Sequence, residues 1–261
     1  MSALNIALIQ SALHWEDSTA NLAMFEEKIW GLKQPADLIV LPEMFNSGFT
    51  SNKEKLAETI NGRTWKWMKQ MAQQTGAAIT GSFIIKVDGN YYNRLVWYQP
   101  DNQVYYYDKH YLFSYTGEDK LFVKGKERVI INWKGWNICP LICYDLRFPV
   151  WSRNAVVDNQ YAYDLLLYVA NWPASRDSAW QHLLHARAIE NSCITIGVNI
   201  VGTDGRGLNY IGNSLICDPL SNDLAQGGDK ETTIEYTLQK STIDDYRLKF
   251  PFLKDEDILL K

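Results

Sequence analysis

The sequence predicts an α/β protein in which two β-sheets of related topology pack face to face, with helices on the outside. Two observations favour this fold. An acidic residue followed by a short buried strand occurs twice, over residues 37–41 and 164–169. A helical pattern over 178–191 and a strand over 194–201 follow the second copy, so the second half repeats the strand and helix order of the first.

The first half alternates strands and helices. Residues 1–10 lack a basic region and a small-residue cleavage site, so they indicate a first strand and no signal peptide. A helix follows, capped at Ser18 or Asn21 and ending near Gly31, because apolar residues recur there at helical spacing. The next expected elements are a buried strand over 37–41, a helix over 64–74 and a strand over 77–85.

The middle of the chain is rich in strands separated by turn signals. Asp88-Gly89-Asn90 predicts a hairpin turn into a strand over 91–98, and Pro100-Asp101-Asn102 predicts the next turn. Lys134-Gly135 predicts another hairpin, between strands over 129–133 and 136–142. This last strand is central to function, because it leads directly to Cys143.

Composition sets limits on organisation and partners. We expect one domain over residues 1–261, with 234–261 as a polar C-terminal extension that lies on the surface or reaches a partner. A net charge of −4 without a basic cluster argues against a nucleic-acid partner, and the absence of a long apolar run argues against the membrane. Four cysteines without C-x-x-C pairs indicate reduced thiols and a cytoplasmic protein.

Three chemically distinct side chains stand at the ends of apolar runs. Cys143 follows the strand over 136–142 and precedes a polar turn, which is how a nucleophile is presented in a crevice above a sheet. Glu43 follows the strand over 37–41, and Lys109 follows a third apolar run. A thiol attacks as the thiolate and needs a base or a cation nearby. An acid, an amine and a thiol at strand ends therefore form a candidate active site.

Histidines offer alternatives to this arrangement. His110 adjoins Lys109, so a protease with a Cys–His pair stays open at this point. A zinc site at His182 and His185 has little support, because no further ligand is positioned by the sequence. Taken singly, Glu43, Lys109 and Cys143 would each suit an ordinary surface or core residue.

Three segments together resemble a known family. Residues 41–45, 107–110 and 141–149 are similar, in the same order, to the Glu, Lys and Cys motifs of the nitrilase, or carbon–nitrogen hydrolase, superfamily. Asn171-Trp172-Pro173 and the helix at 186–191 extend the resemblance, which runs from residue 6 to about 213. The surroundings of Glu43 and Cys143 are similar to the ω-amidase branch. Members of this branch hydrolyse the side-chain amide of 2-oxo dicarboxylic acid monoamides.

The resemblance implies an α-β-β-α sandwich, a homodimer packed through outer helices, and an amidase without cofactor or metal. It implies that Cys143 attacks the amide, that Glu43 transfers protons, and that Lys109 stabilises the oxyanion with the backbone N–H of Tyr144. The family also uses a second glutamate, which Glu118 matches, with Asp119 as a competitor.

The remaining pocket is less defined by the sequence. Tyr144, Arg147, Trp172 and Phe45 are the candidate substrate-binding residues, and Arg147 or Arg176 is the candidate partner of a substrate carboxylate. An Asp145 to Arg147 ion pair is expected to hold the turn after the cysteine. Two other functions stay open: an amidase or carbamoylase of another small amide, and a binding protein that keeps the fold without turnover.

Overall fold

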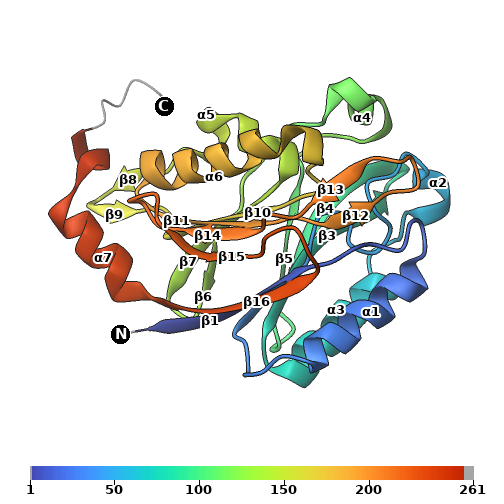
Figure 1. Cartoon of the computed structure of the whole chain (residues 1–261), viewed down its shortest axis with the longest axis horizontal. Helices are drawn as coiled ribbons and strands as arrows, with labels where there is room; N and C mark the ends of the chain where they lie inside the picture. The colour runs from blue at the N-terminus through green and yellow to red at the C-terminus, as the bar shows by residue number, and fades with distance from the viewer. Residues whose placement is uncertain (1, 256–261) are drawn as a thin grey trace.

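Two six-stranded sheets form the centre of the protein in the computed structural model, which describes residues 2–255 (Figure 1). The first sheet contains, in spatial order, β16 (Thr232–Gln239), β1 (Ala3–Gln10), β2 (Leu38–Val40), β3 (Ala78–Val87), β4 (Asn90–Tyr98) and β5 (Val104–Asp108). The second contains β15 (Asp223–Gln226), β14 (Leu215–Cys217), β11 (Ile194–Val198), β10 (Leu165–Val169), β7 (Trp136–Ile142) and β6 (Ile131–Trp133).

The two sheets share one pattern. β1, β2 and β3 are parallel in the first sheet, as are β11, β10 and β7 in the second, and antiparallel strands flank each set of three. The repeat of strand and helix order in the sequence therefore does predict two sheets of related topology. Small hairpins complete the strands: β8 (Val156–Val157) with β9 (Gln160–Tyr161), and β12 (Val201–Thr203) with β13 (Asn209–Ile211).

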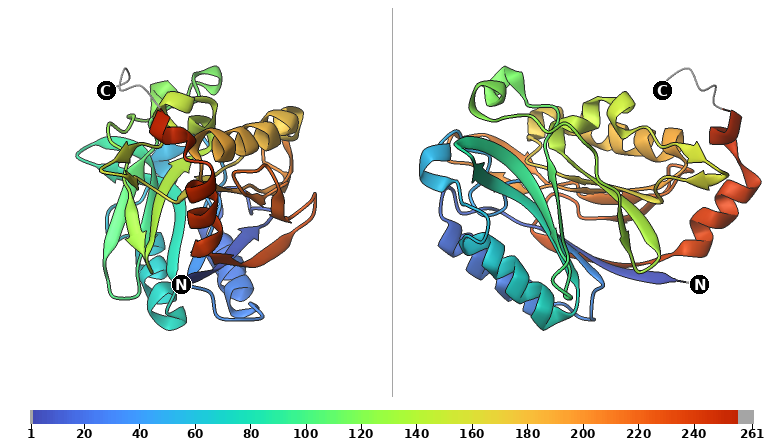
Figure 2. Two further views of the ribbon diagram at one scale, coloured as in Figure 1. Left: turned by 90° about the vertical axis from the view of Figure 1, so that its left-hand side faces the viewer. Right: turned by 180° about the vertical axis from the view of Figure 1, so that it is seen from behind.

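Helices cover both outer faces, which confirms the predicted α-β-β-α sandwich (Figures 1 and 2). α1 (Ser18–Trp30) and α3 (Arg63–Thr75) lie outside the first sheet, and α6 (Asp177–Asn191) lies outside the second. The shorter helices are α2 (Lys53–Leu56), α4 (Glu118–Leu121), α5 (Pro149–Ser152), α7 (Lys240–Lys249) and the 3-10 turns η1 (Ser114–Thr116), η2 (Cys143–Arg147), η3 (Ala174–Arg176) and η4 (Phe252–Asp255). Within residues 2–255, none of the helices combines the length and the apolar character needed to cross a bilayer.

Alternation along β1 shows how the sequence builds two cores. Leu4, Ile6 and Leu8 point between the sheets, into a cluster that also holds Trp136 of β7. Ile9 points the other way, into the cluster between the first sheet and α1 and α3. Both faces of these strands are therefore buried, which is why their sequences read as nearly continuous apolar runs.

The hairpin turns lie where the sequence predicts them, whereas the N-cap of α1 differs by one residue. Asp88 and Gly89 have φ of 48° and 79°, and Lys134 and Gly135 have φ of 48° and 81°, so both pairs form the predicted two-residue hairpin turns. At α1 the cap is Asp17, whose side chain accepts the N–H of Ala20, one residue before the expected Ser18.

The C-terminal segment joins the sandwich. β16 pairs antiparallel with β1 along its whole length, so residue 234, the expected start of an extension, lies inside a sheet strand. After it, α7 runs along one end of the molecule (Figure 1). Arg247 of α7 donates hydrogen bonds to the carbonyls of Ser192 and Tyr163 and to the carboxylate of Asp164. The part of the expected extension at 256–261 lies outside the described residues.

Candidate active site

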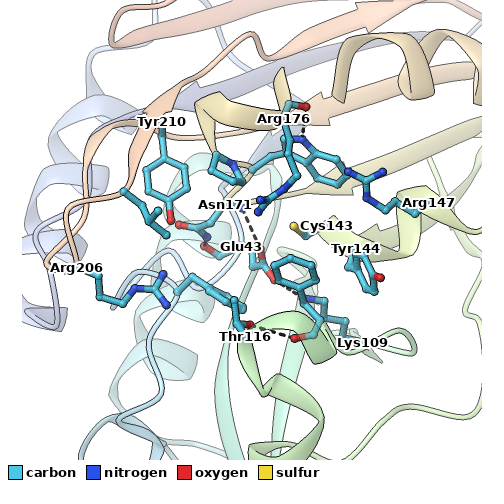
Figure 3. A pocket seen from close by; sticks show the side chains of 15 residues that line it. Glu43, Lys109, Thr116, Cys143, Tyr144, Arg147, Asn171, Arg176, Arg206 and Tyr210 are labelled. Carbon is cyan, nitrogen blue, oxygen red and sulfur yellow. Dashed lines mark hydrogen bonds and ion pairs between the residues drawn. The ribbon is translucent and has the colours of Figure 1, made fainter. Parts of the chain in front are cut away.

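Four polar side chains meet where strands of both sheets end. Glu43 follows β2 and Lys109 follows β5, which run in the same direction in the first sheet; Cys143 follows β7 and Asn171 follows β10, which are parallel in the second. All four line one cavity (Figure 3). The structure thus brings together the acid, the amine and the thiol that the sequence singled out.

Lys109 is the centre of a buried ion-pair network. Its Nζ donates to Glu43 Oε1 at 2.8 Å and to Glu118 Oε1 and Oε2 at 3.0 and 2.9 Å. All three side chains are at most 1 % exposed. Burial alone would lower the pKa of Lys109, but the charges of Glu118 and Glu43 outweigh it and raise that pKa above its usual range. Lys109 is therefore a fixed cation.

Glu118 is the second carboxylate of the network, and Asp119 is exposed at the surface. Glu118 begins α4 and accepts the backbone N–H of Phe113 at 2.6 Å. Burial raises the pKa of Glu118, Lys109 lowers it, and the nearby Glu43 charge raises it again. Of the two candidates for the second glutamate position, only Glu118 contacts Lys109.

Asn93 is a site residue that was not predicted from the sequence. It is fully buried in β4 and donates from Nδ2 to Glu43 Oε1 at 2.8 Å and to Glu118 Oε1 at 3.3 Å. The available signal was a polar amide in the middle of a strand of mainly aromatic and apolar residues. A buried polar side chain needs hydrogen-bond partners, and here the partners are the two catalytic candidates.

Cys143 lies in a sharp turn between β7 and η2. Its φ of 43° is in the left-handed region, which costs a residue with a side chain about 1–2 kcal/mol. The thiol is half-buried and faces the cavity (Figure 3). Burial raises the pKa of Cys143 well above its usual value and the Glu43 charge raises it further, while Lys109 lowers it. The resting thiol is therefore protonated near neutral pH and needs a base to attack.

Asp145 holds this turn, but not through the expected ion pair with Arg147. It is fully buried and accepts the backbone N–H groups of Tyr111 and Ile142 at 2.8 and 3.0 Å. The Tyr107 hydroxyl is its third donor, at 2.7 Å. Burial raises the pKa of Asp145 to about 6, against the lowering effect of these hydrogen bonds.

Asn171 fixes the carboxylate of Glu43 from the second sheet. Its backbone N–H donates to Glu43 Oε2 at 2.9 Å, and its side-chain amide donates to the Glu43 carbonyl. Together with Asn93 and Lys109, this contact restrains both oxygens of Glu43. Asn171 lies in a motif that resembles the family, but no role was predicted for it from the sequence.

The cavity walls contain three of the four candidate substrate-binding residues. Tyr144, Arg147 and Trp172 line the cavity, whereas Phe45 does not. Phe45 is fully buried behind the first sheet and packs against Phe25, Trp67 and Phe83. The physical reason is the turn at Met44, whose φ of 43° breaks the strand alternation and directs Phe45 toward α1 and α3.

Further wall residues were not predicted from the sequence. Phe49 and Phe113 lie near the ion-pair network, and Arg206, Leu208 and Tyr210 come from the β12–β13 hairpin. Arg176, a candidate for the substrate carboxylate, also lines the cavity. The β12–β13 hairpin is far from the catalytic motifs in sequence, so no local pattern connects it to the site.

The histidine alternatives find no support in the geometry. His110 stacks on Trp151, with ring centroids 3.6 Å apart, and its Nδ1 lies 2.7 Å from the Gly125 carbonyl, away from the thiol cavity. On α6, His182 Nδ1 lies 2.6 Å from the Ser178 carbonyl, and His185 Nε2 lies 2.7 Å from Asp223. The groups placed to serve Cys143 are a carboxylate and an amine.

This arrangement is suited to acyl transfer. A thiol, a carboxylate and a fixed cation face one cavity, and these are the groups that acyl transfer through a cysteine needs. Three carboxylate oxygens of Glu43 and Glu118 accept hydrogen bonds from the Lys109 ammonium and fix its positive charge at the cavity wall. The N–H of Tyr144 lies in the first turn of η2, where backbone donors have no partner within the helix.

Comparison with known proteins agrees with this chemistry. The family model for carbon-nitrogen hydrolase matches residues 5–248. The chain is 43 % identical to the omega-amidase YafV of Yersinia enterocolitica, over 100 % of this chain and 99 % of that protein. It is 29 % identical to the 2-oxoglutaramate amidase of Bacillus subtilis, over 96 % of each chain. A carbon-nitrogen hydrolase superfamily protein of Xanthomonas campestris, whose crystal structure has an arsenic adduct in the active site, has a TM-score of 0.96 and 40 % identity over 98 % of each chain.

Proposed function

The chain belongs to the carbon-nitrogen hydrolase family, and on this premise we propose that it is an ω-amidase. The substrates are monoamides of 2-oxo dicarboxylic acids, such as 2-oxoglutaramate and 2-oxosuccinamate, and the products are ammonia and the dicarboxylic acid. The observation that carries the proposal is the buried Glu43, Lys109 and Glu118 network beside the Cys143 thiol. The full-length identity to an omega-amidase supports the substrate class.

The first half-reaction forms a thioester. Glu43 takes the proton of the Cys143 thiol as the sulfur attacks the amide carbon, so the thiolate does not have to persist in the resting enzyme. Lys109 and the Tyr144 N–H stabilise the negative charge that develops on the amide oxygen. Glu43 then gives its proton to the departing nitrogen. The carbon–nitrogen bond breaks and ammonia leaves.

The second half-reaction uses the same carboxylate. Glu43 removes a proton from a water molecule, which attacks the thioester carbon, and the tetrahedral intermediate is again stabilised by Lys109. The carbon–sulfur bond breaks, and the proton on Glu43 returns to the thiolate. Asn93 and Asn171 keep Glu43 in place through both steps, because they bind one carboxylate oxygen each.

Ammonia release tests this function. Wild-type protein should release ammonia from 2-oxoglutaramate and 2-oxosuccinamate faster than from a nitrile, an N-carbamoyl compound or a neutral amide. Cys143→Ala should abolish the release, and Cys217→Ala, which changes a buried cysteine of β14, should retain it. Mass spectrometry after a rapid quench should find an acyl adduct on Cys143. Unchanged turnover in Cys143→Ala would exclude the mechanism.

We also propose that the protein is a cytoplasmic homodimer. The outer surface beside the second sheet exposes the large apolar residues Val150 of α5 and Ile189 of α6, at 74 % and 49 %. Contacts through these helices would remove them from water. Light scattering coupled to size-exclusion chromatography should give twice the chain mass, and a monomer at micromolar concentration would count against the interface. The free thiols at the four cysteines suit a reducing compartment.

A further inference from the structure

The cavity above Cys143 contains more positive charge than the catalytic network uses. Three arginines line it in addition to Lys109: Arg147, Arg176 and Arg206 (Figure 3). A substrate that carries a carboxylate needs a cation in the pocket, placed so that the amide carbon of the same substrate can still reach the thiol. The three guanidinium groups differ in their partners within the protein, and this difference indicates which one is free to bind a substrate carboxylate.

Arg206 is already paired. It lies in the loop between β12 and β13 and donates from Nη2 and Nε to Asp204 Oδ2 at 2.9 and 3.2 Å. Asp204 also accepts the backbone N–H groups of Arg206 and Leu208, and the pKa of its carboxyl is lowered by these donors despite the raising effect of burial. The charge of Arg206 is therefore offset within its own loop.

Arg147 and Arg176 differ from Arg206 in the groups that surround them. Within residues 2–255, neither guanidinium lies within ion-pair distance of a carboxylate. Each lies over an aromatic ring instead: Arg147 is 5.0 Å from the centroid of Trp172, and Arg176 is 5.2 Å from that of Phe113. Both side chains are half-buried. A half-buried cation without a counterion, at a cavity wall, is suited to bind an anionic ligand.

The main chain of Arg176 is held in place by Trp172. The indole Nε1 of Trp172 donates to the Arg176 carbonyl at 2.8 Å, and the Trp172 backbone N–H donates to Asn199 Oδ1 at 2.7 Å. The Arg176 side chain reaches into the middle of the cavity, on the side of Cys143, whereas Arg147 lies further to one side (Figure 3). The contact with the Phe113 ring and the fixed carbonyl restrict the guanidinium before substrate arrives, which lowers the entropic cost of binding.

We propose that Arg176 binds the carboxylate of the substrate and thereby determines which amides are hydrolysed. This inference rests on the proposed ω-amidase function and names the residue responsible for its substrate class. The planar guanidinium donates two parallel N–H groups to the carboxylate, while the amide carbon at the other end of the substrate meets Cys143. Arg147 adds positive charge nearby, and Arg206 has no direct contact with the substrate. A neutral amide would leave the Arg176 charge unpaired.

A comparison of two substrates in four proteins tests the assignment. Wild type, Arg176→Met, Arg176→Lys and the matched control Arg206→Met are assayed with 2-oxoglutaramate and with pentanamide, a neutral amide. Arg176→Met should lower kcat/KM for 2-oxoglutaramate on the order of 100-fold and leave that for pentanamide within about threefold. Arg176→Lys should recover part of the loss, because it restores the charge but not the two parallel donors. Arg206→Met should change both values little.

Binding gives a readout that does not depend on turnover. In the Cys143→Ala background, calorimetry with 2-oxoglutaramate should show a Kd that Arg176→Met weakens on the order of 100-fold and Arg206→Met does not. Circular dichroism establishes that each variant is folded. A purely structural role of Arg176, through its contact with Phe113 beside Glu118, would lower the rates for both amides equally and would overturn the assignment.

Failure of this inference can be told apart from failure of the proposed function. If wild type hydrolyses 2-oxoglutaramate but Arg176→Met loses no selectivity, the function stands and the assignment of Arg176 is wrong. Selectivity lost in Arg147→Met or Arg206→Met instead would overturn it in the same way. If wild type releases no ammonia from any carboxylate-bearing amide, the proposed function fails, and the assignment fails with it.

Discussion

The hydroxyl of Tyr107 donates a hydrogen bond to Asp145 Oδ2 at 2.7 Å and so joins the two sheets beneath the active site. Tyr107 lies in β5, two residues before Lys109, and Asp145 lies in η2, two residues after Cys143. The same hydroxyl accepts the Trp151 indole N–H at 2.9 Å. This buried contact therefore sets the position of the lysine relative to the thiol, although neither partner touches the substrate.

Tyr107→Phe removes this connection without changing the shape of the core. We expect the free energy of unfolding to fall by about 1–3 kcal/mol, because Asp145 and the Trp151 indole each lose a partner in a buried place. We expect kcat to fall about tenfold or more, because small misplacements of catalytic groups are costly. Urea denaturation and ammonia release measure the two effects. Tyr105→Phe is the matched control on the same strand, since within residues 2–255 the Tyr105 hydroxyl bonds only to the exposed Gln103. Equal behaviour of the two variants would contradict the assigned role.

The thiol of Cys143 should react slowly with alkylating agents at neutral pH. Burial and the Glu43 charge raise its pKa, so the reactive thiolate is rarer than in a free cysteine, whose pKa is about 8.5. The rate of carboxamidomethylation should still rise above pH 9, where that of a free thiol levels off. Cys139, Cys193 and Cys217 are fully buried, whereas Cys143 lines the cavity, so native protein should be labelled at Cys143 alone. A plateau near pH 8 would show that the resting enzyme holds a thiolate.

Glu43→Gln separates the two effects of this carboxylate. It removes a negative charge that raises the pKa of Cys143, so the pH profile of alkylation should move to lower pH. It also removes the base, so kcat for ammonia release should fall on the order of 10²- to 10⁴-fold. We therefore expect a variant whose cysteine is easier to alkylate and whose turnover is slower. Parallel losses in both assays would instead indicate that Glu43 mainly maintains the structure.

Much of this fold could be predicted from the sequence because its signals are local. Apolar runs, helical spacing and the pairs Asp88-Gly89 and Lys134-Gly135 predict strands, helices and hairpins from adjacent residues. The pairing of β16 with β1 joins residues more than 200 positions apart, and a half-polar strand such as Thr232–Gln239 does not indicate its partner. A C-terminal extension was therefore expected where the sheet has an edge strand.

The site was predictable to the extent that its residues stand at strand ends. Glu43, Lys109 and Cys143 follow apolar runs, and family motifs add Glu118. Asn93 lies in the middle of β4, so its contact with Glu43 depends on the order and register of the first sheet. Phe45 was predicted to bind substrate but does not line the cavity. The left-handed backbone at Met44 turns the Phe45 side chain toward the core between the first sheet and its helices.

Glu118→Gln tests whether the second glutamate acts through Lys109. The charge of Glu118 raises the pKa of Lys109, and its two oxygens fix the ammonium beside Glu43. We expect kcat to fall about 10- to 100-fold with a smaller change in KM, because the oxyanion partner is displaced while the rest of the pocket remains. Asp119→Asn is the control, since that neighbour is exposed and should leave kcat unchanged. A similar loss in both variants would mean that the α4 turn, and not the Glu118 carboxylate, matters.

Arg247→Met tests whether the C-terminal helix stabilises the sandwich. The Arg247 side chain is 7 % exposed. Its guanidinium donates to the Ser192 and Tyr163 carbonyls at 2.9 and 2.8 Å and to Asp164 at 2.7 Å, which connects α7 to the residues that flank the second sheet. Removing it leaves buried acceptors unpaired, so the free energy of unfolding in urea should fall by about 2–4 kcal/mol. The catalytic kcat should be unchanged, because these contacts lie outside the thiol cavity. Lys249→Met, at an exposed position of the same helix, should cost less than about 0.5 kcal/mol. If Arg247→Met is equally mild, α7 is held by its apolar contacts, such as that of the fully buried Ile243, and not by this arginine.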